Sequence, residues 1–136
     1  MIYFISGHRD LSYEEFEKYY VPKIEGVIKN DPFAEFLVGD CDGVDKYAMD
    51  YLYNQTSKEF AIYHMFDTPR NLPSNYTFSG SIKEIMIGRV AVIGHFKTDE
   101  ERDSAMTRNS DFDIAFVKDN RWNSGTAQNI KRRHNI

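Results

Sequence analysis

The stretch SGTAQN at residues 124–129 decides the fold that the sequence predicts. It follows the short apolar run 113–117 (DIAFV) and opens the last expected helix. A strand, a turn of small residues and a helix start together direct free backbone N–H groups and the positive end of a helix dipole to one place. Such places bind anions. We therefore expect Ser124, Gly125 and Thr126 to contact a phosphate group, although a plain N-cap would also explain them.

Two upstream turns have the same character. Residues 6–9 (SGHR) follow the apolar run Ile2–Ile5, and residues 39–43 (GDCDG) follow the run Glu35–Val38. Glycine in such a turn lets a ligand approach the backbone closely, and Arg9 offers a fork of donors for phosphate. Because the carboxyl ends of parallel strands meet at one edge of a sheet, we expect all three turns to form one pocket.

Hydrophobic periodicity gives the order of the elements. We expect strands over residues 2–5, 35–38, 60–66, 89–93 and 113–117, and helices over 13–30 (broken near Pro22), 44–52, 99–109 and from 124 onward. The first five elements alternate as βαβαβ, which predicts a parallel sheet with right-handed crossovers. Residues 67–94 predict an irregular insertion that serves as a lid or ligand loop, with a short helix over 82–87.

Composition limits the class of protein. The chain has 136 residues and 41% hydrophobic residues, which predicts one packed domain over 1–136. A formal charge of −4 disfavours a general nucleic-acid binder, and the basic run 131–134 suits the end of a helix. A single cysteine, Cys41, excludes an intrachain disulfide and predicts a cytoplasmic setting. No apolar run approaches the roughly 18 residues of a membrane span.

Five short motifs, in order, resemble one family. They are ISGHR at 5–9, VGDCDGVD at 38–45, RDSAM at 102–106, SDFDIA at 110–115 and the Gly-Thr pair at 125–126. This pattern resembles the SLOG superfamily of Smf/DprA and LOG-like proteins, and most closely its small stand-alone YspA/YpsA-like branch. The resemblance implies a Rossmann-like three-layer α/β fold with a mainly parallel sheet of about five strands. It also implies a nucleotide or nucleotide-derived ligand.

The three turns and the resemblance together give a set of expected ligand contacts. These are Gly7, His8, Arg9, Gly39, Asp40, Gly43, Asp45, Arg102, Met106, Ser124, Gly125 and Thr126. A helix-capping role is the alternative for the aspartates of the second turn, and a surface helix with charged pairs is the alternative for residues 99–109. Ligand contact through that helix would use the face that Arg102, Met106 and Asn109 share by their spacing.

Two positions depart from the pattern that the resemblance implies. Asp103 stands where asparagine is usual, and Asn129 stands where members that cleave N-glycosidic bonds carry glutamate. We therefore expect a sensor or accessory protein that binds a phosphorylated ligand. The alternative is a hydrolase or transferase acting on the N-glycosidic bond, with its acids drawn from Asp40, Asp45 or Glu84.

Other chemistries have weaker signals. No histidine stands at metal-ligand spacing from another histidine or from the cysteine, so we expect neither a metal nor a resident cofactor. Cys41 as a nucleophile lacks a histidine in a fixed position beside it. Asp111 and Asp113 precede a strand and suit a structural role. A non-catalytic interaction module is a third hypothesis, and 15% aromatic residues lead us to expect an apolar patch that could form a homodimer.

Overall fold

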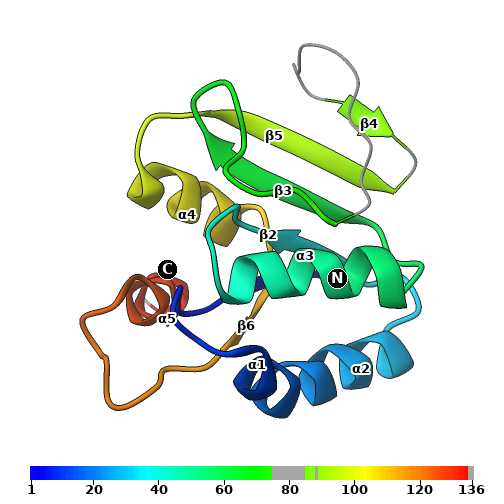
Figure 1. Cartoon of the computed structure of the whole chain (residues 1–136), viewed down its shortest axis with the longest axis horizontal. Coiled ribbons are helices and arrows are strands. Elements are labelled where there is room, and N and C mark those ends of the chain that lie inside the picture. The colour runs from blue at the N-terminus through cyan, green and yellow to red at the C-terminus, as the bar shows by residue number, and fades with distance from the viewer. Residues whose placement is uncertain (75–84, 88, 135–136) are drawn as a thin grey trace.

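The structure, a computed structural model, describes residues 1–74, 85–87 and 89–134 (Figure 1). Its elements in chain order are β1 (Ile2–Ser6), α1 (Tyr13–Tyr19), α2 (Val21–Asn30), β2 (Glu35–Val38), α3 (Val44–Gln55), β3 (Phe60–Met65), β4 (Ile85–Ile87), β5 (Val90–Phe96), α4 (Asp99–Arg108), β6 (Phe112–Ala115) and α5 (Gly125–His134).

The strands form one sheet in the order β4-β5-β3-β2-β1-β6. The five strands from β5 to β6 are all parallel to their neighbours, and the short β4 pairs antiparallel with β5 at the edge. This is the expected Rossmann-like α/β fold. The chain moves outward from β1 to β5 and then crosses back to place β6 on the other side of β1, so the topological switch point lies between β1 and β6.

Helices cover both faces of the sheet, which gives three layers (Figure 1). On the face of α1, α2 and α3, the residues Phe16, Tyr20 and Ile24 follow one another at four-residue steps and are fully buried against the sheet. On the opposite face, Ala105 and Met106 of α4 pack on β1, β2 and β3 in a second apolar cluster. Each face therefore has its own core.

Pro22 separates α1 from α2, as its missing N–H predicts. The predicted helix over 82–87 is wrong where it can be checked, because Ile85–Ile87 form β4. Apolar runs this short fit a strand as well as a helix, and pairing with β5 decides the outcome. Residues 82–84 lie outside the described residues. The insertion 67–94 is also less irregular than expected, because it contains β4 and the start of β5.

The start of α3 also differs in detail from the expectation. Helix capping was the alternative role for the aspartates of the second turn, but no side chain caps this helix start and the N-cap is Gly43. Its φ of 76° is a conformation that glycine adopts without strain. Within the described part of the chain, no helix has the length and apolar content needed to cross a bilayer.

Candidate functional site

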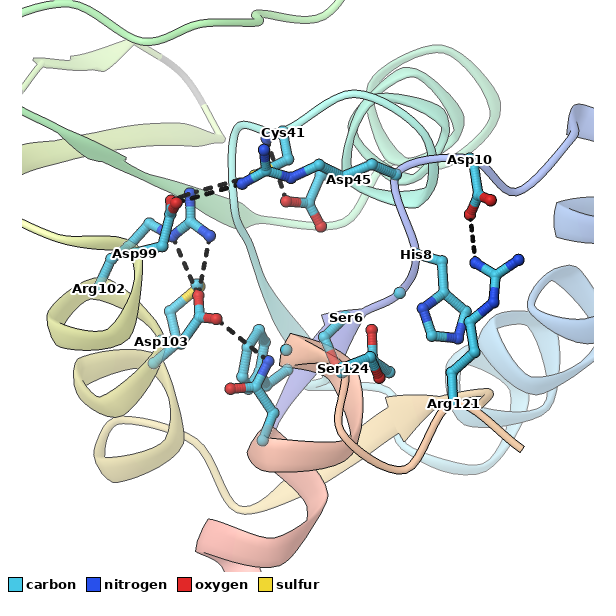
Figure 2. Close-up of a pocket in the computed structure, with 17 residues that line it drawn as sticks. Ser6, His8, Asp10, Cys41, Asp45, Asp99, Arg102, Asp103, Arg121 and Ser124 are labelled. Carbon is cyan, nitrogen blue, oxygen red and sulfur yellow. Dashed lines mark hydrogen bonds and ion pairs between the residues drawn. The ribbon is translucent and has the colours of Figure 1, made fainter. Parts of the chain in front are cut away.

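A cavity of about 460 Å³ opens at the carboxyl edge of the sheet, beside the switch point between β1 and β6 (Figure 2). The turn after β1, the start of α3, the first turns of α4 and the start of α5 contribute its walls. Seventeen residues line it: Phe4, Ser6, Gly7, His8, Arg9, Asp10, Cys41, Asp45, Asp99, Arg102, Asp103, Met106, Arg121, Ser124, Gly125, Thr126 and Asn129. Ligands of open α/β sheets bind at this position.

The N-terminus of α5 presents unpaired donors to the cavity. Ser124 caps the helix, because its Oγ accepts the Ala127 N–H at 3.2 Å and its carbonyl accepts the Gln128 N–H at 3.0 Å. The N–H groups of Gly125 and Thr126 have no acceptor within the described part of the chain. A Cβ placed on Gly125 would meet no protein atom within 4 Å. Two N–H groups and the helix dipole are therefore open to a bound anion.

Ser6 adds a third unpaired donor. It is the last residue of β1, it is 4% exposed, and its hydroxyl is buried without a hydrogen-bond partner in the described residues. The Tyr20 hydroxyl holds this strand end by donating to the Ser6 carbonyl at 2.8 Å and accepting the Phe116 N–H at 3.0 Å. An unpaired buried hydroxyl costs free energy, so its place in the cavity wall points to a ligand contact.

His8 has a defined tautomer. Its Nε2 lies 2.9 Å from the Lys118 N–H and must accept that hydrogen bond, so the proton of the neutral ring is on Nδ1. Burial, helped by the positive charge of Arg121, lowers the pKa of His8. The ring is therefore neutral at pH 7 and can donate from Nδ1 to an acceptor in the cavity.

Asp45 is the buried carboxylate of the cavity. It is 7% exposed, and its Oδ2 accepts the Cys41 N–H at 3.1 Å. Its other oxygen has no partner among the described residues, and the carboxylate points toward the centre of the cavity in Figure 2. Burial raises the pKa of Asp45 to about 7, although the nearby Arg102 guanidinium acts in the opposite direction.

Arg102 is the centre of an ion-pair network at the other wall. It is 4% exposed and pairs with Asp40 at 2.8 Å, Asp103 at 2.9 Å and Asp99 at 3.2 Å. Three carboxylates already occupy its donors, so it supports the wall rather than offering a free guanidinium. Arg9 is mostly exposed and, among the described residues, pairs with one carboxylate, Asp99, at 3.2 Å, so donors of its guanidinium remain available to an anion.

The second glycine turn lies behind the lining. Gly39, Asp40 and Gly43 do not line the cavity. A Cβ on Gly39 would approach the Asp45 Oδ2 to 2.5 Å, and a Cβ on Gly43 would approach the Arg9 carbonyl oxygen to 2.4 Å. These glycines therefore allow the turn to pack against the carboxylate and the first turn.

Asp40 is used in the same internal way. Besides Arg102, it binds the backbone N–H of Arg70 at 2.7 Å and the Arg70 guanidinium at 3.0 Å. This contact attaches the loop 67–74 to the second turn. The expected ligand role of the loop stays a prediction, since residues 75–84 lie outside the described residues.

Nine of the twelve expected contacts line the cavity. They are Gly7, His8, Arg9, Asp45, Arg102, Met106, Ser124, Gly125 and Thr126. Packing also requires glycine at position 7, because a Cβ there would approach Val44 Cγ2 to 2.4 Å. The first and third turns meet directly at the cavity, while the second contributes only Cys41 and Asp45.

Several lining residues were not among the expected contacts. The position of Ser6, a polar residue at the end of an apolar strand, could have indicated a contact. The position of Asp99 in the first turn of a capped helix could have done the same. Arg121 had no signal, because it lies in a loop that the structure ties to the first turn through its ion pair with Asp10 at 2.6 Å.

The two unusual positions noted in the sequence are neighbours in the cavity wall. The Asn129 side chain donates to Asp103 Oδ2 at 3.4 Å, and Asp103 Oδ1 is held by Arg102. Asn129 also accepts from Arg132. A carboxylate therefore remains at this wall, but it comes from α4 and is fixed by hydrogen bonds on both oxygens.

The structure also bears on other roles considered from the sequence. Asp111 accepts the Ile2 N–H, and Asp113 pairs with Arg133 at 2.8 Å, which fits the structural role expected for both. Burial and the Asp45 charge raise the pKa of the Cys41 thiol, which opposes a nucleophilic role. Among the described residues, no three His, Cys, Asp or Glu side chains are grouped so that they could hold a metal ion.

Comparison with known proteins adds no relative. No protein-family description, curated protein or solved structure matches the chain. Membership of the SLOG superfamily therefore stays a prediction.

Proposed function

We propose that this protein binds a nucleotide or nucleotide-derived phosphorylated ligand in the cavity, with a phosphate group at the N-terminus of α5. The observation that carries the proposal is the buried hydroxyl of Ser6, which has no partner among the described residues, in a residue that lines the same cavity as Gly125 and Thr126 with their free N–H groups. Phosphate oxygens are strong acceptors and would satisfy all of these donors.

The rest of the lining supports a ligand larger than phosphate alone. A cavity of about 460 Å³ lies within the range of roughly 300–1,000 Å³ typical of small-molecule sites. Phe4 and Met106 provide apolar surface, and Asp45 provides an acceptor for a hydroxyl or amino group. Since Asp103 and Asn129 are held by hydrogen bonds, a sensor or accessory role suits this wall better than rapid turnover.

Substitution Gly125→Asp tests the proposal. The new carboxylate would lie at a helix N-terminus, where negative charge stabilises the helix, but it would repel phosphate. We expect wild-type protein to bind at least one member of a panel of AMP, ADP, ADP-ribose and NAD in isothermal titration. The variant should bind it at least about tenfold more weakly without a lower melting temperature.

Gly26→Asp is the matched control, because Gly26 lies in α2 and a Cβ there meets nothing within 4 Å. It adds the same charge away from the cavity and should leave the affinity intact. Binding of the ligand to Gly125→Asp at wild-type strength, or failure of every phosphorylated compound to bind, would reject the proposal.

The second candidate function is cleavage of an N-glycosidic bond, and one observation favours it. Asp45 lines the cavity with a pKa raised by burial to about 7, near the value suited to proton transfer at neutral pH. Of the other two expected acids, Asp40 is engaged by two arginines and Glu84 lies outside the described residues. This activity would be supported if wild-type protein releases free base from nucleoside monophosphates and the Asp45→Asn variant does not. Absence of release at high protein concentration would oppose it.

A further inference from the structure

We propose that Asp45 is the specificity-determining residue of the cavity: its free carboxylate oxygen accepts a hydrogen bond from a hydroxyl or amino group of the ligand, so the site selects phosphorylated compounds that carry such a donor over phosphate itself. The inference rests on the proposed function, since it assumes that a phosphate group occupies the N-terminus of α5. Beyond the proposed function, it identifies the chemical group of the ligand that the wall at Asp45 recognises.

The local packing holds Asp45 in one position. The Cys41 N–H fixes one oxygen at 3.1 Å, and the missing Cβ of Gly39 leaves the room that this oxygen fills. No guanidinium or ammonium group of the described residues lies within ion-pair distance of Asp45, although the residue is 7% exposed. The free oxygen is not among the fully enclosed unpaired side-chain atoms of the described residues, so it opens into the cavity that Asp45 lines, where a donor group of a ligand can reach it.

The other carboxylates of the cavity do not share this property. Asp99 gives its oxygens to Arg9, Arg70 and Arg102, and Asp103 gives its oxygens to Arg102 and Asn129. Asp10 is paired with Arg121 at 2.6 Å. Its Oδ1 takes this contact, and the Asp10 side chain is exposed. Of the four aspartates that line the described cavity, Asp45 alone is buried and keeps an oxygen without a donor.

The opposite wall has the complementary chemistry. Ser6 and Ser124 lie across the cavity from Asp45 in Figure 2, and this side also has the free N–H groups of α5. A ligand with a phosphate at one end and hydroxyl groups a few bonds away would satisfy both sides. A second phosphate directed at Asp45 would be repelled by its charge. A pKa near 7 for Asp45 fits a carboxyl that can accept or, when protonated, donate such a hydrogen bond.

The test compares two probes, inorganic phosphate and ribose 5-phosphate, by NMR titration of the intact protein. In wild type we expect ribose 5-phosphate to bind at least about tenfold more tightly than phosphate, since a hydrogen bond to a charged group is involved. Asp45→Asn keeps an acceptor for the Cys41 N–H and nearly the same shape. We expect it to reduce that affinity ratio about tenfold, while the affinity for phosphate is equal to or above that of wild type.

Asp99→Asn is the matched charge control. It removes one negative charge from the same cavity but no free acceptor, so both probes should change their affinity together and the ratio should remain. A ratio that Asp45→Asn leaves within twofold of wild type overturns the assignment of Asp45 while phosphate binding stands. Failure of both probes to bind wild type, at concentrations where the nucleotide panel also fails, overturns the proposed function and this inference together.

Discussion

The turns at 39–45 and 124–126 share three general features but differ in their surroundings. Both follow a strand, contain glycine and lead into a helix. In the first, Asp40 is engaged by Arg70 and Arg102, and Gly43 packs on the backbone of Arg9. In the second, the N–H groups of Gly125 and Thr126 have no acceptor among the residues that the structure describes. Glycine therefore allows close packing in one turn and leaves open space in the other, and only the neighbours of each turn distinguish them.

Removal of Asp40 should have the largest effect on stability. Asp40→Ala leaves the buried Arg102 without one of its carboxylates and releases the Arg70 contacts. We expect the free energy of unfolding to fall by about 3–5 kcal/mol, measured by urea denaturation. Asp42→Ala is the control in the same turn, because Asp42 is exposed and its one side-chain hydrogen bond within the described residues is to Asn71. A loss below about 1 kcal/mol for Asp40→Ala would mean that the second turn is not held from within.

Asp45 should make stability depend on pH. Its folded-state pKa of about 7 lies above the value near 3.9 of an unfolded aspartate, so the folded protein binds the proton more tightly. The contribution of this group to stability is complete below about pH 4 and falls as the pH rises toward 7. Asp45→Asn should remove this decline, and its free energy of unfolding should exceed that of wild type by up to about 4 kcal/mol near pH 8.

The measurement is urea unfolding of both proteins between pH 4 and pH 8. A constant difference between wild type and Asp45→Asn across that range would show that Asp45 titrates as an exposed carboxyl does, and would weaken its assignment as the buried acceptor.

Alanine at Gly43 and at Gly125 compares the two turns directly. Gly43→Ala forces a methyl group to within 2.4 Å of a backbone oxygen at a φ of 76°, and should cost about 2–3 kcal/mol. Gly125→Ala meets no atom within 4 Å and should change stability by less than about 0.5 kcal/mol. Thermal unfolding of the two variants measures these effects. Equal losses of stability would contradict the different packing of the two turns.

The two serines of the cavity give the smallest expected effects, with opposite signs. Ser124→Ala removes the cap of α5 and should cost about 1 kcal/mol. Ser6→Ala removes a hydroxyl that has no partner within the described structure, so stability should be unchanged or rise by up to about 1 kcal/mol, while phosphate affinity falls. A clear loss of stability in Ser6→Ala would indicate that the hydroxyl is satisfied inside the protein.

Much of the fold could be predicted from the sequence. Local apolar patterns predict several elements, because strand and helix periods are local properties of the chain. They include the apolar runs that lead to the turns at residues 6, 39 and 124, and the helical stripe of Phe16, Tyr20 and Ile24. The short run 85–87 could not be assigned, since only pairing with β5 makes it a strand.

The sequence by itself determined the parallel α/β sheet, the glycine turns and the capped start of the last helix, because each depends on residues close together in the chain. Only the tertiary structure decided which polar groups stay free. Arg102 and Asp40 are 62 residues apart and neutralise each other, whereas Ser6 and one oxygen of Asp45 meet no donor or acceptor in the described residues. Whether a buried polar atom is satisfied depends on partners from distant segments, and that is a property of the packed molecule.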